Sequence, residues 1–193
     1  MVGAGSTGDL VYIARWQAQS AQKAACLGIS DSGDFNYQIL SDDTVQIAGY
    51  LGSGGEVVIP EKIEGRKVVS VGENAFFRKA DITKIEIPDS VSRIGYGAFE
   101  GCTGIVDLVI PKGIRQVEVR AFYGCTALKS VEIPDSVCYI EGNAFGDCTS
   151  LKKLTIPEGV IQIGVLAFHN CKSLESLTIP DSVEEIEMYA FEG

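Results

Sequence analysis

The chain has 193 residues, of which 46% are hydrophobic and 22% are charged, and this is the composition of a folded protein with its own core. Its formal net charge of −10 argues against nucleic acid and anionic membrane surfaces as partners, because both attract clustered Lys and Arg. No apolar run approaches the roughly 20 residues that cross a bilayer, so direct membrane insertion is not expected, and no signal peptide is visible.

The first expected unit, residues 1–33, combines a Gly-rich flexible start with a helix. Residues 9–25 hold good helix formers, Asp9 is a candidate N-cap, and Tyr12 and Trp16 are one turn apart. This helix would pack beside the next unit. The alternatives are that it comes from an adjoining domain, pairs with another chain, or derives from cloning.

The second expected unit, residues 34–71, reads as an N-terminal β cap with an irregular first repeat. It shows a strand, a turn at residues 41–43, a strand, a Gly-rich turn and another strand. Sixteen residues separate Pro60 from Phe76, whereas eleven separate Pro88 from Phe99 in the next repeat. Terminal repeats are expected to be atypical because one of their faces meets water.

The third expected unit, residues 72–193, repeats with a period of 23 residues. An apolar-x-Ile-Pro sequence in each unit predicts a short strand that the proline ends. One unit cannot bury its own apolar side, so we expect stacked coils with parallel strands about 4.8 Å apart and columns of like residues. The recurring phenylalanines, each preceded by Ala, are Phe76, Phe99, Phe122, Phe145, Phe168 and Phe191. The recurring prolines and cysteines are Pro88, Pro111, Pro134, Pro157 and Pro180, and Cys102, Cys125, Cys148 and Cys171.

The repeat pattern L-x-x-L-x-I-P-x-x-V-x-x-I-x-x-x-A-F-x-x-C resembles the BspA-like (Treponema pallidum-type) leucine-rich repeat over about residues 34–193. The resemblance implies a leucine-rich repeat right-handed solenoid that is mainly β with short helical turns (α/β in broad schemes). It also implies a cell-surface or secreted bacterial protein, adhesin-like, that binds a host, matrix or other cell-surface protein.

The cysteines and the single histidine are the residues that chemistry would use. Four of the six cysteines share one column, so we expect buried, reduced thiols, with a disulfide between adjacent coils or a metal site as alternatives. Cys26 and Cys138 lie off this column, and Cys138 is expected to be the more exposed and reactive. His169 occupies a variable turn position, which favours a solvent-facing side chain over a general base. No catalytic motif is present, so we expect no catalytic residue, no cofactor, no metal and no enzyme activity.

The candidate partner-binding residues project outward from the predicted strands, two from each repeat. Their mixed chemistry is also typical of a plain solvated sheet, which is the alternative. A second candidate is the variable stretch before each Ala-Phe pair, which holds Tyr96 and Met188. The outward strand residues are Lys84, Glu86, Asp107, Val109, Ser130, Glu132, Lys153, Thr155, Ser176 and Thr178.

The function expected from this pattern is non-catalytic protein recognition, and the alternative is a structural spacer or scaffold with no specific ligand. The last repeat stops before its cysteine, since Gly193 corresponds to Gly101, so the array is expected to be truncated. End-to-end self-association through this uncapped C-terminal coil is a subsidiary hypothesis.

Overall fold

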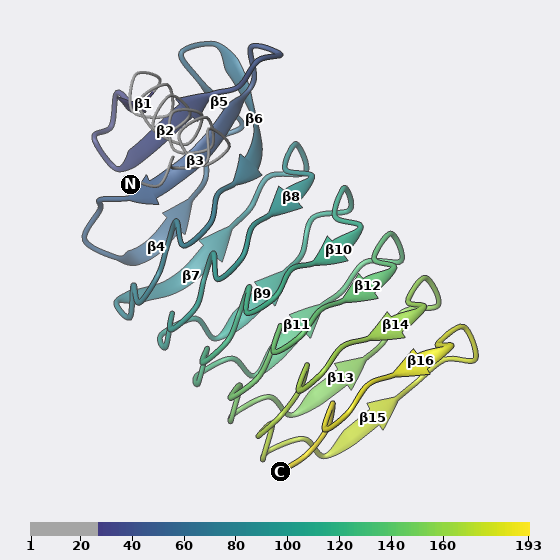
Figure 1. The fold of residues 1–193 in the computed structure, drawn as a ribbon. Helices are drawn as coiled ribbons and strands as arrows, with labels where there is room; N and C mark the ends of the chain where they lie inside the picture. Colours follow the sequence, from purple (N-terminus) through teal and green to yellow (C-terminus); the bar gives the residue numbers. More distant parts are fainter. Residues whose placement is uncertain (1–26) are drawn as a thin grey trace, which may run out of the picture.

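The computed structural model describes residues 27–193 (Figure 1), and the helix predicted over residues 9–25 and Cys26 lie outside this range. Sixteen strands and no helix make up the described residues, so none of their elements is a helix that could span a bilayer. Successive coils stack along one axis, as Figure 1 shows for β7 to β16. The predicted solenoid is therefore confirmed.

The array begins with a sheet of strand order β1-β2-β3-β6-β5, in which β8 (Arg93–Ile94) also pairs with β6. Pairing of β1 with β2 and of β2 with β3 is antiparallel, whereas β3 pairs with β6 in parallel. The sheet therefore converts from hairpin pairing to the parallel pairing of the coils. Its strands are β1 (Leu27–Ile29), β2 (Phe35–Ile39), β3 (Val45–Tyr50), β5 (Lys62–Ile63) and β6 (Arg66–Val71).

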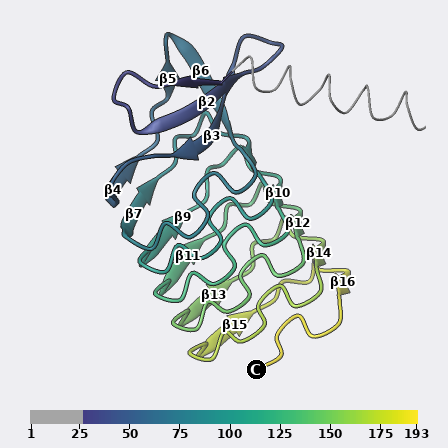
Figure 2. The ribbon, with the colours of Figure 1, turned by 60° about the vertical axis from the view of Figure 1, so that its left-hand side comes forward.

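Each coil contributes two short strands, which form two rows on different sides of the stack (Figure 2). From β9 to β15 in one row and from β10 to β16 in the other, paired residues differ by 23, as in Ser130 with Asp107 and Tyr139 with Gln116, so the sequence period becomes the parallel register. The first row is β4 (Gly55–Val58), β7 (Ile82–Glu86), β9 (Asp107–Val109), β11 (Ser130–Glu132), β13 (Lys153–Thr155) and β15 (Ser176–Thr178). The second row is β8 (Arg93–Ile94), β10 (Gln116–Val117), β12 (Tyr139–Ile140), β14 (Gln162–Ile163) and β16 (Glu185–Ile186).

The core contains a continuous stack of phenylalanine rings along the axis. From Phe99 to Phe191 neighbouring ring centroids lie 5.3–5.4 Å apart with interplanar angles of 2–10°. Phe76 continues the stack at 4.8 Å from Phe99, and Tyr50 of β3 lies 5.3 Å from Phe76. The first five phenylalanines of the column are at most 1% exposed. Stacking of coils therefore buries residues that a single coil would expose.

The short helical turns expected between the strand rows are tight turns, and none of the residues from 27 to 193 forms a helix. The reason is a left-handed backbone at two positions in each coil, as at Arg120 (φ 58°) with Gly124 (φ 70°) and at Leu166 (φ 59°) with Asn170 (φ 57°). A positive φ interrupts the right-handed helical path every few residues. The coil therefore folds back within a few residues without a helix.

Candidate functional site

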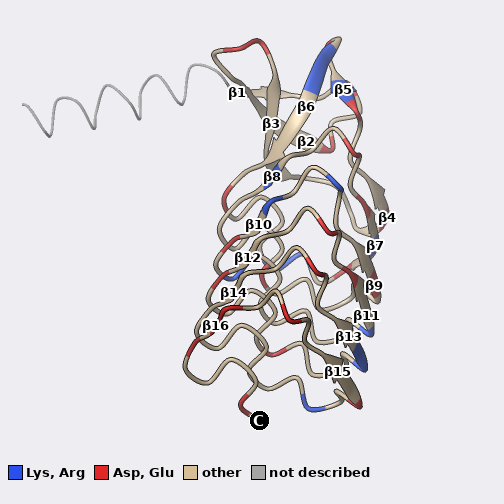
Figure 3. Cartoon of the chain, turned by 90° about the vertical axis from the view of Figure 1, so that its right-hand side faces the viewer, with Lys and Arg blue, Asp and Glu red and all other residues tan. Residues whose placement is uncertain are grey.

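All ten predicted partner-binding residues lie on the exposed outer side of the first strand row, which we call the strand face. They come from β7, β9, β11, β13 and β15, and Figure 3 shows charged residues of both signs along this row. Their exposure follows from strand alternation. In β9 and β13, for example, the central Leu108 and Leu154 are 2% exposed and fill the core, so their neighbours point outward.

Parallel pairing in register arranges the strand face as two columns of side chains. Asp107, Ser130, Lys153 and Ser176 lie side by side on successive strands, as do Val109 and Glu132. The chemistry of each column changes from coil to coil, in contrast to the uniform Phe, Ala and Cys columns inside. The strand face therefore presents side chains at regular positions, while the kind of residue at each position differs between coils.

Two residues of this face were missed by the sequence analysis. Glu56 and Val58 of β4 are exposed and pair with Lys84 and Glu86 of β7, so they extend both columns by one strand. The local signal was present, because residues 57–60 read Val-Val-Ile-Pro and match the apolar-x-Ile-Pro pattern. This match was overlooked because the first repeat has a longer distance from Pro60 to Phe76 than the later repeats have between the same positions.

Charges at the β4–β7 end of the strand face are mostly acidic. Lys84 Nζ donates to Glu86 Oε1 at 2.7 Å and lies 3.9 Å from Glu56 Oε2. The hydrogen bond to Glu86 and the nearby carboxylates raise the pKa of Lys84 above its usual value. Asp107 on the next strand accepts a hydrogen bond from Ser130. The β13–β15 end instead presents hydroxyls and Lys153.

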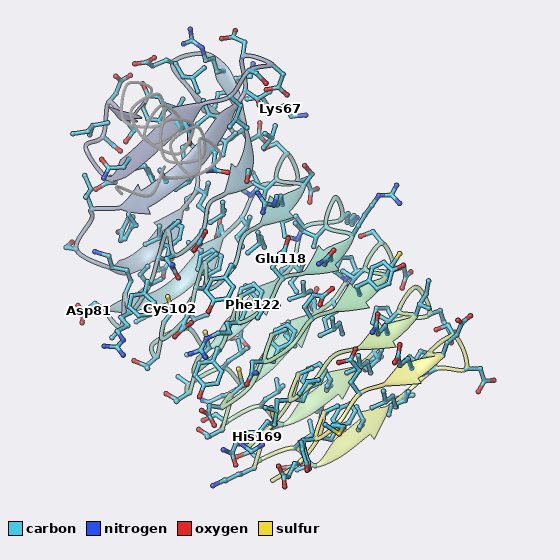
Figure 4. The ribbon with its side chains drawn as sticks, viewed as in Figure 1. Lys67, Asp81, Cys102, Glu118, Phe122 and His169 are labelled. Atoms are coloured by element: carbon cyan, nitrogen blue, oxygen red, sulfur yellow. The ribbon has the colours of Figure 1, made fainter. Side chains whose placement is uncertain are left out.

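The cysteine column is part of the core, as predicted. Each of its four thiols is free, buried and placed to donate to the carbonyl of a Phe 26 residues earlier: Cys102 to Phe76 at 3.1 Å, and Cys125, Cys148 and Cys171 to Phe99, Phe122 and Phe145 at 3.4 Å. Figure 4 shows Cys102 and Phe122 inside the stack. Burial raises the pKa of Cys102 and Cys171 to about 12. The column therefore links adjacent coils by hydrogen bonds.

Thiol labelling tests this assignment. At pH 8 we expect an alkylating reagent to modify the half-buried Cys138 in the folded protein and to leave the column cysteines unmodified, because burial both shields them and disfavours their thiolates. Site-resolved mass spectrometry measures the difference, and unfolding in guanidinium should make all cysteines reactive. Modification of Cys125 or Cys148 at the rate of Cys138 would contradict a buried column.

His169 is less exposed than predicted. Its side chain is 28% exposed, and Nδ1 is shielded from solvent, lacks a hydrogen-bond partner and lies 3.7 Å from Glu192 Oε2 (residue labelled in Figure 4). The prediction of a solvent-facing side chain is therefore wrong in degree. The turns stack like strands, with Asn170 N donating to Glu192 O, and this stacking brings the Glu192 carboxylate of the following coil close to the imidazole ring.

The variable stretches on the turn side do not form one continuous apolar patch. Arg120 donates two hydrogen bonds of 2.8 Å to Glu100, and its guanidinium lies 4.2 Å from the centroid of the Tyr123 ring. The Tyr123 hydroxyl donates to Asp147, and Asn170 Nδ2 donates to the same carboxylate at 2.8 Å. The bond from Tyr123 lowers the pKa of Asp147, and the same bond raises the pKa of Tyr123. These contacts link four successive coils, so their role is to hold the coils together.

The chain is similar to known repeat proteins in both sequence and structure. The profile of the BspA type leucine rich repeat region matches residues 69–193 in six copies. A leucine rich repeat protein of T. pallidum is similar at 30% identity with a TM-score of 0.75, over 82% of this chain and 81% of that one. A leucine rich cell surface protein from Faecalibacterium prausnitzii is similar at 33% identity and a TM-score of 0.77, over 83% and 45% of the two chains.

A further similar structure is a leucine-rich repeat protein from Bacteroides ovatus, at 26% identity and a TM-score of 0.64, over 82% of this chain and 49% of that one. The chain thus spans about half the length of the F. prausnitzii and B. ovatus proteins. No protein with a curated description matches the chain.

Proposed function

The chain belongs to the BspA-type leucine-rich repeat family, and on this premise we propose that it recognises a protein through the strand face and catalyses no reaction. Repeats of this family suggest an interaction or scaffold module. One observation supports recognition in particular. The coils use their uniform columns for stacking and present, on the outside, two columns of varied side chains at fixed spacing.

We also propose a cell-surface or secreted, adhesin-like role with a host, matrix or other cell-surface protein as the partner. The support is similarity to the F. prausnitzii structure, which is described as a leucine rich cell surface protein. The acidic surface, with a net charge of −10, favours a protein partner over nucleic acid.

The strand face is tested by reversing its charge at the centre. Phage-displayed random peptides are selected on the folded chain, and their affinities are measured by surface plasmon resonance for wild type and for the Glu132→Lys, Thr155→Lys variant. Both residues are exposed, so we expect at least a tenfold loss of affinity with no shift in the thermal midpoint beyond 2 °C, or about 0.5 kcal/mol.

The matched control carries the same substitutions away from the strand face, as Glu184→Lys with Thr126→Lys, both exposed in the structure. It should bind like wild type. Selected peptides that bind the strand-face variant unchanged would show that recognition lies elsewhere. Failure to select any saturable binder would instead favour the alternative function, a structural spacer.

Self-association is a second proposal, and it rests on apolar side chains of the last coil. Ile186 is 47% exposed and Met188 is 68% exposed. Equivalent Ile positions in earlier coils are buried by the coil that follows, as for Ile163 at 0%. A second copy could cover these residues end to end. A concentration-dependent dimer in analytical ultracentrifugation would support this, and a monomer at high concentration would exclude it.

A further inference from the structure

The strand face is interrupted between β7 and β9. Strands β9, β11, β13 and β15 form one sheet, whereas β7 pairs only with β4. At the β9–β11 step Lys129 N donates to Val106 O at 2.7 Å and Ile110 N donates to Glu132 O at 3.0 Å, but in the described chain no backbone hydrogen bond joins β7 to β9. The sheet therefore has a seam at this step.

The seam directly follows the irregular first coil. Partners in β4 and β7 differ by 28 residues, as in Val57 with Ile85, and their register shifts at Gly55 and Glu56. Partners farther along differ by 23. The longer coil and the regular coils thus meet at β7, and the regular strand pairing is interrupted there.

A hollow of about 500 Å³ opens on the strand face over this seam. This volume lies within the roughly 300–1,000 Å³ of ligand pockets in proteins. Its apolar lining comes from Ile85, Ile87, Val106 and Val109, and Val109 has 59% of its surface exposed. Val109 is also the one apolar residue among the ten predicted partner-binding positions. Exposed apolar surface inside a hollow is typical of a place where a partner side chain is received.

The charged lining of the hollow is mostly acidic. Glu56, Glu86 and Asp107 contribute three carboxylates, and Lys84 contributes one ammonium group. That ammonium is already engaged, since Lys84 donates to Glu86 at 2.7 Å. Glu56 and Asp107 therefore leave a net negative charge beside the apolar lining residues. Its complement is an apolar side chain with basic neighbours in the partner.

We propose that this seam hollow is the anchor point of the recognition surface, and that it takes a large apolar side chain of a partner protein flanked by Lys or Arg. This inference rests on the proposed recognition function and specifies its partner. Burial of one Leu-sized side chain supplies the attraction, and the carboxylates of Glu56 and Asp107 select the flanking residues.

The test uses three blocked tripeptides, Lys-Leu-Lys, Glu-Leu-Glu and Lys-Ser-Lys, titrated into the ¹⁵N-labelled full chain and followed by NMR. We expect saturable shifts confined to residues 83–87 and 106–109 for Lys-Leu-Lys, and at least tenfold weaker binding for the other two. Val109→Arg should abolish binding by filling the hollow and adding positive charge. Ile161→Arg, at another exposed apolar position directly before β14 and away from the strand face, should leave binding unchanged.

Equal affinity for the three peptides, shifts spread over all the strands, or undiminished binding to Val109→Arg would each overturn the inference. Peptides selected from the phage library separate it from the proposed function. If these peptides lose affinity for the Glu132→Lys, Thr155→Lys variant but bind Val109→Arg unchanged, recognition through the strand face is supported and the seam hollow is not its anchor point. If the selected peptides do not bind Val109→Arg but still bind Ile161→Arg, the recognition function and the anchor point are both supported.

Discussion

Replacement of Phe145 by alanine is expected to lower the free energy of unfolding by about 3–5 kcal/mol. Phe145 is fully buried, and its ring lies 5.3 Å from both Phe122 and Phe168. The substitution removes the largest apolar side chain of its coil and breaks two ring contacts in the middle of the stack. Urea unfolding followed by circular dichroism measures the change, with the slope of the transition checked for loss of cooperativity.

Phe191→Ala is the control for this prediction. Phe191 contacts one ring in its column, Phe168, and is only partly buried, so its loss should cost less than half as much. A cost below 1 kcal/mol at Phe145, or equal costs at the two positions, would mean that the ring stack contributes little to stability.

Gly159→Ser is expected to destabilise the protein by about 1–3 kcal/mol, although serine is the residue that the repeat pattern favours there. Ser90, Ser136 and Ser182 hold the corresponding position in other coils. A Cβ at Gly159, however, would lie 2.0 Å from Asp135 O and 3.0 Å from Val137 O, so the backbone of the preceding coil must move. Thermal unfolding of the variant measures the cost.

Gly113→Ser provides the matched comparison, because Gly113 occupies the same position of the repeat as Gly159 and also has Ser-containing coils next to it. Its added Cβ would meet Val91 O at 3.2 Å, which a few tenths of an ångström of adjustment relieves. The new hydroxyl could then bond a carbonyl of the preceding coil, as Ser136 does to Ile114 O at 2.7 Å. We expect a change within about 0.5 kcal/mol. Equal effects at Gly113 and Gly159 would show that the coils adjust freely.

The sequence predicted the fold well because its period corresponds to one physical step, the stacking of a coil on its neighbour. The 23-residue spacing of Phe122 and Phe145 became ring contacts, and that of Ser130 and Lys153 became strand pairs. The buried Cys148 followed from the same column logic. The outward direction of residues such as Glu132 followed from alternation within the strand.

Features that depend on how far one coil sits from the next could not be read from the pattern. The strand-face residue Val58 was hidden by the longer first repeat, and the seam beside Val109 arises where that coil meets the regular ones. The contact of His169 with Glu192 and the crowding at Gly159 by Asp135 O likewise involve a neighbouring coil. The repeat pattern shows which residues of successive coils lie above one another, but it does not show how closely the atoms of one coil approach the next.

The central claim is that stacking uses the uniform columns inside and leaves the strand face for recognition. A scan of all single substitutions from 72 to 193, scored in parallel for folding stability and for retention of a selected peptide, tests it most directly. We predict that stability fails at the Phe, Ala and Cys columns, and that substitutions which remove binding but preserve stability fall on the strand face. Tolerance of polar residues at Phe122 and Phe145, or binding-specific positions gathered on the turn side, would contradict the account.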